Sequence, residues 1–595
     1  MLGSKIPVFG EIDSMGKTYK EETPHATPRS KISQYKYPAL SPIFWRTLSS
    51  IGNIHRSMWS LVQYRRIGRQ VEREWQEKGQ KQGDTDNKSA LRDVEVGSGQ
   101  GLLRGFNDVR EKGSSRDRTK SEGSSSSGNG KIIVDITGDD DPIDPHNWPL
   151  LARCKNIAVL CLLIFSQGWA SAADSMANSR MSQDYGVSRV AANLSQALYL
   201  LGIGSGCLFC GPLSETIGRN PTYLGATIGY LCFVLGTALT SNLGGRIVCR
   251  YFVGVFASAT LGINGASVSD QFRPVKRAFA FPVIAWANVA APMLAPVAGG
   301  WLVQNRNLSW HWTDWVTLII SGFAFIVASL FLPETYLPVL LDWKARHLRR
   351  VSGSPRYVSG HAEKAQFLQR LRQTLPMPVV FFTSEPVVAV LGGYLILVYI
   401  LMFTFLSGFD YIFKKTYGLS DGLTGSCFAS IAAGSTFFTL FAPALFHFTR
   451  VHTNYVRQAW IKPEYRLWPA IATAPLMPIS LFWLGWTNYP SISLWSGLAA
   501  CFCFGIVATA VYVSSYEYIV DSYTEHSAVA LASITMARYL IAGTMVMAAR
   551  PMYTGIGVHW TMTLLGCIGL LLAPAPLFFR WYGAKLRAKS AYAES

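Results

Sequence analysis

The sequence predicts an all-α membrane protein with twelve transmembrane helices in two six-helix halves, preceded by a disordered N-terminal tail. Three observations lead to this prediction. Only 15% of the 595 residues are charged, against about 25% in a typical soluble protein. Twelve apolar segments are each long enough to cross the hydrocarbon core of a bilayer. A long basic segment, 342–384, divides these segments into six and six, the pattern of an internal structural repeat.

Residues 1–149 are predicted to form a cytosolic, mostly disordered tail. The Ser/Gly-rich stretch over 113–131 has the composition of a segment that cannot bury a core. Between 44 and 69, apolar residues recur at helical spacing beside several arginines. This pattern favours either a transient helix in the tail or a basic amphipathic helix on the anionic inner leaflet. The apolar residues are Phe44, Leu48, Ile51, Met58 and Val62.

The remaining chain is divided by its apolar segments. We expect an N-terminal half over 150–341, a cytosolic central loop over 342–384, a C-terminal half over 385–582 and a cytosolic tail over 583–595. The predicted spans are 154–175, 191–212, 221–243, 245–268, 278–302, 315–332, 386–409, 422–446, 467–487, 492–519, 526–548 and 558–580.

Basic residues set the expected orientation. Residues 150–595 hold 31 basic and 16 acidic residues, and the basic ones gather in alternate loops, the central loop and the C-terminal tail. The positive-inside rule places these on the cytosolic side, with both termini inside. It also explains the net charge of +18 without nucleic acid as a partner. Asn307, in an Asn-Leu-Ser sequence of an outer loop, is a candidate glycosylation site, although it lies close to the membrane.

The sequence lacks the motifs of common membrane enzymes and ATPases. No HExxH, GxSxG or phosphate-loop spacing is present, and no His cluster has metal-ligand spacing. Cys207 and Cys210 form a CxxC inside an apolar span, where both are more simply small packing residues. We therefore expect no catalytic residue, no cofactor and no metal.

A short polar turn joins the second and third predicted spans. Its sequence, GPLSETIGR over 211–219, resembles the inter-helix motif of the major facilitator superfamily, with Glu in the usual Asp position. Gly at the first position would allow close helix contact, and Gly218 would allow a sharp turn. The resemblance implies that the acid faces the start of the eleventh span near Ser527 and holds the cytosolic side closed. Arg219 could instead be only a positive-inside anchor. The motif residues are Gly211, Leu213, Glu215, Gly218 and Arg219.

The fourth predicted span contains a charge. Arg250 and Gly254 resemble the R-x-x-x-G element of the same family, and a charged residue within a span usually marks a pathway or relay. Asp174 ends the first span at a similar depth. The two side chains could pair, and a proton taken by Asp174 would then release Arg250. Alternatively, both side chains extend to the outer surface.

The fifth predicted span resembles the family's antiporter motif, G-P-x-x-G-P-x-x-G-G. Alanine replaces both glycines that precede the prolines, which weakens the assignment, while Pro292, Pro296, Gly299 and Gly300 are kept. Small residues let helices approach and proline with glycine makes a bendable segment. Within the family this motif implies export.

The segment Pro333–Pro338, PETYLP, looks like the signature of fungal twelve-span drug:H⁺ antiporters, and the resemblance covers roughly residues 141–590. Three charged residues of the C-terminal half need an explanation. Arg538 should lie near the bilayer centre, and Asp521 belongs to a family-like segment after the tenth span. Glu517 either lines the cavity or is a solvated helix end.

The resemblance implies a proton-coupled secondary transporter that exports small organic molecules (drugs, toxins or secondary metabolites) across the plasma membrane by alternating access. A polyamine or organic-cation transporter of the same fold is one alternative, and a non-transporting membrane sensor is another. The expected partners are a small-molecule substrate, protons and membrane lipid, and we expect a monomer.

Overall fold

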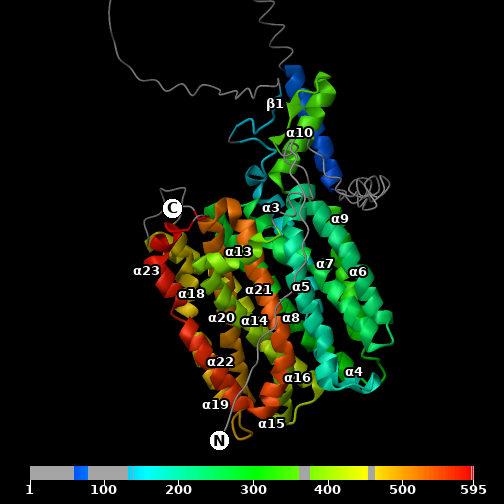
Figure 1. Ribbon diagram of the computed structural model, residues 1–595, viewed down its shortest axis with the longest axis vertical. Helices are drawn as coiled ribbons and strands as arrows, with labels where there is room; N and C mark the ends of the chain where they lie inside the picture. The colour runs from blue at the N-terminus through cyan, green and yellow to red at the C-terminus, as the bar shows by residue number, and fades with distance from the viewer. Residues whose placement is uncertain are drawn as a thin grey trace, which may run out of the picture. The chain divides into compact units, whose positions relative to one another are not determined.

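The computed structural model describes residues 59–77, 131–138, 140–360, 375–452, 462–590 and 592–593. Within these residues, twelve helices are long and apolar enough to cross a membrane. This confirms the predicted all-α fold with twelve spans (Figure 1). Large apolar side chains such as Leu151, Leu440 and Leu571 are exposed on these helices, as expected for a surface that faces lipid.

The N-terminal half consists of six continuous spans. They are α3 (Leu150–Ala170), α5 (Arg189–Ile217), α6 (Arg219–Leu239), α7 (Leu243–Ser269), α8 (Pro274–Gln304) and α9 (Trp312–Phe331). A short helix, α4 (Asn178–Asp184), lies between the first two. The second span is longer than predicted, because α5 continues past Pro212 and ends only at Gly218.

The C-terminal half is less regular, and several of its spans are interrupted. Its helices are α14 (Pro386–Phe409), α15 (Lys415–Tyr417), α16 (Asp421–Cys427), α17 (Ala429–His452), α18 (Trp468–Thr473), α19 (Leu476–Trp486), α20 (Leu494–Ser522), α21 (Ser527–Gly555), α22 (Val558–Leu572) and α23 (Ala575–Arg587). Shorter turns are η2 (Asp410–Lys414), η4 (Pro463–Leu467) and η5 (Thr524–His526). Pro469 and Pro475 lie where the ninth span is divided, since proline cannot donate an interior helical hydrogen bond.

Several helix pairs join the halves. Helix α21 packs along α5, and α8 packs against α16 and α17. Figure 1 shows α5 and α21 side by side, between α6 and α9 on one flank and α19 and α22 on the other. The seam between the halves therefore includes α5, α8, α16, α17 and α21.

Part of the predicted tail and central loop is folded. A helix over 59–77 packs on α10 (Leu337–Ser352), burying Ile67 and Val71 against Leu340. Of the residues in the predicted amphipathic helix, Phe44, Leu48, Ile51 and Met58 lie outside the described residues, and Val62 is exposed. The structure places this helix against protein, while residues 1–58 and 78–130 of the predicted disordered tail lie outside the described residues.

A two-stranded parallel sheet extends this contact. Strand β1 (Ile132–Ile133) pairs with β2 (Tyr357–Val358), with Ile132 opposite Tyr357. The turn η1 (Pro145–Asn147) and α13 (Met377–Ser384) complete the described connections. Burial raises the pKa of Asp141, but the N–H groups of Ile143 and Thr137 and the ammonium of Lys344 outweigh it, so this pKa lies below its usual value.

Candidate functional site

Most of the predicted site residues lie at the two ends of the bundle. We call these the Arg219 end, where α5 passes into α6, and the Asp174 end, where α3 passes into α4. The remaining ones are on α8 and at the centre of α21.

At the Arg219 end, the motif arginine is a buried structural link. Its Nε donates to Asp270 Oδ2 at 2.9 Å and its Nη1 donates to Ser214 Oγ at 2.6 Å. Its guanidinium carbon lies 4.8 Å from the centre of the Tyr336 ring. Arg219 is only 4% exposed, so it does not extend to the surface. It connects the end of α5, the end of α7 and the segment before α10.

Glu334 of the PETYLP segment completes this junction, a role that was not predicted from the sequence. Its carboxylate is fully buried and accepts from the backbone N–H groups of Arg219 at 3.0 Å and Asn220 at 3.1 Å. It also accepts from Thr335 and Tyr336 at 3.0 and 2.9 Å. Burial raises the pKa of Glu334 above its usual value, and the N–H groups of Tyr336, Arg219 and Asn220 with the charge of Arg219 oppose that rise only in part. An anion at the start of α6 is favoured by its unpaired N–H groups.

The two motif glycines behave differently. Gly218 has φ +112°, and a Cβ there would lie 2.5 Å from Glu334 Oε2, which agrees with the predicted sharp turn. Gly211 has no atom within 4 Å of an added Cβ. The expectation that Gly211 allows close helix contact is therefore wrong. The tight contacts of α5 are instead at Gly202 and Gly206, which face α7.

The acid of the motif lies beside the start of the eleventh span. Glu215 and the first residues of α21, Ala528 and Val529, line one small pocket. Leu213 lies on the same turn of α5. The acid therefore faces the first turn of α21, as the resemblance implies, while a gating role remains a proposal.

At the Asp174 end, four buried charges form one cluster, which we call the quartet. Arg250 Nη2 contacts Asp174 Oδ1 and donates to Asp314 Oδ1 at 2.8 Å. Arg246 donates to Asp174 Oδ2 at 2.9 Å and to Asp314 Oδ2 at 2.7 Å. Ser195 Oγ donates to Asp174 Oδ2 at 3.0 Å. Two guanidinium groups and two carboxylates balance in charge, and none of the four side chains is more than 6% exposed.

The sequence indicated only half of this quartet. Asp174 and Arg250 do pair, whereas Arg246 and Asp314 were missed. Arg246 precedes Arg250 by four residues, so both lie on one face of α7. Asp314 is in the first turn of α9. Two arginines four residues apart in one span, and an acid in the first turn of a later span, would have indicated this charge cluster. Gly254, one turn further, brings α7 against α5, because an added Cβ would overlap the backbone oxygen of Tyr199.

A second ion-pair cluster crosses between the halves at the Arg219 end. Asp521 of α20 accepts from Arg277 of α8 at 3.3 Å and from Arg466 Nε at 2.8 Å. Arg466 also donates to Glu517 Oε2 at 3.1 Å and to the backbone oxygen of Pro274. Glu517 is thus neither solvated nor free in a cavity, but buried beside an arginine. The described residues contain no group of His, Cys, Asp and Glu side chains that could hold a metal ion.

The proline and glycine motif of α8 joins the halves at the Asp174 end. An added Cβ at Gly300 would lie 2.6 Å from the backbone oxygen of Asp421, while Gly299 faces the turn after α3. Pro292 and Pro296 lie within the continuous helix α8, and the oxygen of Pro296 contacts Gly425. Gly422 N donates to Gln304 Oε1 at 2.8 Å. The halves therefore contact each other at both ends of the bundle.

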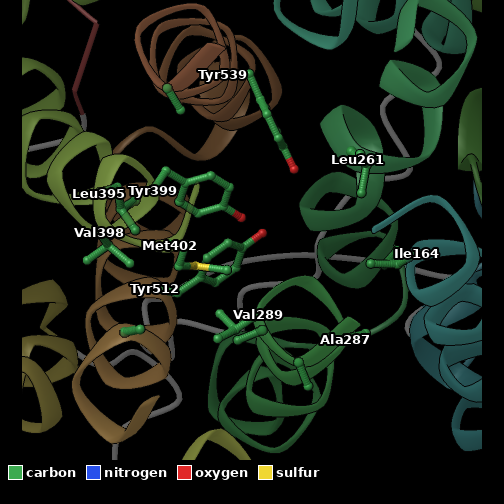
Figure 2. Close-up of a cluster of buried hydrophobic side chains, with 14 of the residues drawn as sticks. Ile164, Leu261, Ala287, Val289, Leu395, Val398, Tyr399, Met402, Tyr512 and Tyr539 are labelled. Carbon is green, nitrogen blue, oxygen red and sulfur yellow. The ribbon is translucent and has the colours of Figure 1, made fainter. Parts of the chain in front are cut away.

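Arg538 lies at the middle of α21 and is fully buried. Its guanidinium carbon is 4.4 Å from the ring centre of Tyr399 and 5.1 Å from those of Tyr512 and Tyr539. Figure 2 shows Tyr399 and Tyr512 beside Met402 and Tyr539 above them, opposite apolar side chains of α3, α7 and α8. Asn307, the candidate glycosylation site, is exposed in the loop between α8 and α9.

These features define a class of protein. Twelve spans form two six-helix halves, with contacts between the halves at both ends and a buried charge at the centre, as in secondary transporters. The sequence model of the Major Facilitator Superfamily matches residues 158–547. The chain belongs to the major facilitator superfamily, and it is a multi-pass membrane transporter rather than an enzyme.

Curated fungal relatives cover most of the chain. The MFS-type transporter kojT of Aspergillus flavus is 38% identical over 463 residues, which are 77% of this chain and 82% of that protein. The citrinin biosynthesis cluster MFS transporter mrr1 of Monascus ruber is 31% identical over 77% of this chain and 92% of its own length. The multidrug transporter FLU1 of Candida albicans is 31% identical over 78% of this chain and 76% of its own length. The chain is thus of the drug-efflux-like type within the superfamily.

Proposed function

We propose that this protein is a proton-coupled exporter of small organic molecules at the plasma membrane. In this proposal the Arg219 end and both termini are cytosolic, and the two halves move around a central site. The observation that carries the coupling is the buried quartet of Asp174, Asp314, Arg246 and Arg250. Two carboxylates whose only charged partners in this quartet are the two arginines form a charge-balanced unit that the addition of one proton would unbalance.

Protonation of Asp174 would break this balance. A neutral Asp174 leaves Arg246 and Arg250 sharing the single carboxylate of Asp314, and a buried unpaired charge is costly. The two guanidinium groups favour the charged form of Asp174 as the quartet stands. Proton uptake should therefore accompany a rearrangement of α7 relative to α3. Such a rearrangement is what a proton-driven transporter requires.

Contacts between the halves support alternating access. The Arg277–Asp521 pair links them at the Arg219 end, and the Gln304–Gly422 hydrogen bond links them at the Asp174 end. In the proposed cycle, a state with both ends in contact is an occluded state. Opening either end needs only one of these sets of contacts to break, so the two halves can move as units.

The names of two relatives, a multidrug transporter and a citrinin-cluster transporter, support drugs or metabolites as the substrate class. A polyamine substrate is less favoured, because the carboxylates Glu517 and Asp521 are already paired with Arg466. The sensor alternative makes a different prediction, since a sensor would move no compound.

The first experiment measures accumulation of a panel of fluorescent drugs, aromatic acids and radiolabelled spermidine in yeast that lacks its own pumps. Expression of the protein should lower accumulation of at least one compound, and a protonophore should abolish the effect. If no compound responds while the protein is present at the membrane, the exporter proposal is contradicted and the sensor is favoured.

The second experiment tests coupling itself, with the exported compound in proteoliposomes. Asp174→Asn should still exchange substrate when its concentration is equal inside and outside, because exchange needs no net proton movement. Substrate accumulation driven by a pH gradient should fall by about tenfold or more. Asp421→Asn is the matched control, since Asp421 pairs with Lys414 within one half. Equal pH-driven accumulation in wild type and Asp174→Asn would refute this role of the quartet.

A further inference from the structure

The guanidinium group of Arg538 differs from the other buried arginine side chains of the spans. Arg246, Arg250 and Arg466 each contact two carboxylates. Within the described residues, Arg538 contacts no carboxylate, and its Nε, Nη1 and Nη2 atoms are buried without a hydrogen-bond acceptor. Its neighbours are aromatic rings, with that of Tyr516 at 5.5 Å.

Aromatic rings compensate such a charge only in part. A cation over a ring gains a modest electrostatic attraction, whereas a guanidinium carries five N–H donors and is always charged. A buried arginine with unused donors is costly unless a partner supplies acceptors. The hydroxyls of Tyr399 and Tyr512 are also buried without a partner at hydrogen-bonding geometry among the described residues. What the group lacks is an acceptor, and an anion would satisfy the arginine and both hydroxyls together.

The position of this group suits a substrate. Tyr399 is on α14, Tyr512 on α20, and Arg538 on α21, so three helices of the C-terminal half converge there. Figure 2 shows the tyrosine hydroxyls directed toward the side where the N-terminal half presents Ile164 and Leu261. Ala287 and Val289 of α8 add to this apolar wall and are fully buried. The group is polar on one side, apolar on the other, and lies at the seam of the halves.

We propose that Arg538, with the hydroxyls of Tyr399 and Tyr512, binds the transported substrate, and that this substrate is a small organic anion with a flat apolar body. A carboxylate or an ionised enol or phenol would accept from the guanidinium, and the body would pack between the tyrosine rings and the wall of the N-terminal half. This assignment rests on the proposed transport function and specifies its substrate class. A cationic compound of the same shape would be repelled by the unpaired charge.

The proposal has a consequence for stability that a packing role would not have. If Arg538 binds an anionic ligand, the guanidinium charge is uncompensated in the ligand-free protein. Arg538→Met keeps similar bulk and removes the charge, so the ligand-free variant should melt at a higher temperature than wild type. If the contacts between Arg538 and the surrounding tyrosine rings instead stabilise the fold, the variant should melt at a lower temperature than wild type. That result would overturn the proposal.

Binding is tested on the purified full-length protein in detergent by ligand-induced thermal shift. The probes are benzoate, 2-naphthoate and indole-3-acetate, each compared with its primary amide and its amine analogue. At least one carboxylate should bind about tenfold tighter than its amide and amine, and Arg538→Met should remove this preference. Arg538→Lys should retain part of it, because the charge stays while the forked donor geometry is lost.

Arg580→Met is the matched control, since Arg580 lies over Trp468 at 3.9 Å near one end of the bundle, and its removal should leave the carboxylate preference unchanged. Equal binding of carboxylate, amide and amine, or no binding of any carboxylate, would overturn the proposal. Thermal shift needs no transport. Carboxylate binding in a protein that moves no compound would therefore refute the exporter function while leaving the site intact.

Discussion

Glu334 shows how one carboxylate can fix the geometry of several segments. Its two oxygens accept four backbone N–H groups, two at the start of α6 and two from its own turn. The side chain of Gln63, from the helix over 59–77, in turn exchanges hydrogen bonds at 3.1 Å with the backbone N–H and C=O of Glu334. Arg219 is therefore positioned from both sides, by Asp270 at its guanidinium and by Glu334 at its backbone.

We expect Glu334→Ala to destabilise the protein by about 1–3 kcal/mol, because buried N–H groups at the start of α6 lose their acceptor. The melting temperature of the purified protein should fall, and less of it should reach the membrane. Asp140→Ala removes an exposed carboxylate and serves as the control. A melting temperature for Glu334→Ala equal to that of the control would show that the four hydrogen bonds do not stabilise the α5–α6 junction.

At the scale of the helix, contact between α5 and α7 depends on glycines that face one another. A Cβ added at Gly202 would lie 3.0 Å from the Cα of Gly254, and a Cβ added at Gly254 would lie 3.0 Å from the Cα of Gly202. Small residues at such a contact let two backbones approach closely, which is how helices pack in a membrane. Helix α7 carries both arginines of the quartet, so this contact also sets their position.

The glycines at 254 and 211 provide a matched comparison. Gly254→Ala should lower stability by about 1–3 kcal/mol, because its methyl group would overlap the backbone of Tyr199 and force the helices apart. Gly211→Ala meets open space and should be neutral or raise stability by up to about 1 kcal/mol. Thermal melting of the two purified variants checks both signs. A neutral Gly254→Ala would contradict the close packing of α5 on α7.

The existence of the spans was predictable, because an apolar stretch long enough to cross a bilayer is stable as a helix in the membrane and unstable in water. The ends of the spans were not, since they depend on local contacts. Helix α5 runs to Gly218 because the left-handed turn there is fitted to Glu334. The helix over 59–77 and the β1–β2 pair depend on docking to α10, which no periodicity within those short segments reveals.

At the scale of the whole molecule, the sequence predicted charged residues better than their partners. Arg250 and Asp174 could be paired by depth, but Arg246 and Asp314 join them only because α7 and α9 both pack against α3. Glu517 and Asp521 could not be interpreted without Arg466, which is some fifty residues away in the chain. Ion pairs between distant helices depend on tertiary packing, so they cannot be predicted from a single sequence.

The cluster at the Arg219 end makes a prediction about the movement of the halves. Asp521 joins Arg277 of the N-terminal half to Arg466 of the C-terminal half. Asp521→Asn should weaken this link by about 1–2 kcal/mol and shift the population toward a state open at the Arg219 end by about 5–30-fold. Leu531, which is 1% exposed and lies against Gly265 of the other half, would then become accessible.

A cysteine at position 531 measures this opening directly. In a background lacking the exposed Cys154, Cys232 and Cys567, Leu531→Cys should react slowly with a maleimide, and faster when Asp521→Asn is added. Asp421→Asn removes a carboxylate whose partner, Lys414, is in the same half, so it should leave the labelling rate unchanged. If the rate is the same with and without Asp521→Asn, the Arg277–Asp521 pair does not hold this end closed. The halves would then be held together there by apolar contacts of α21 with α5, and not by the charges.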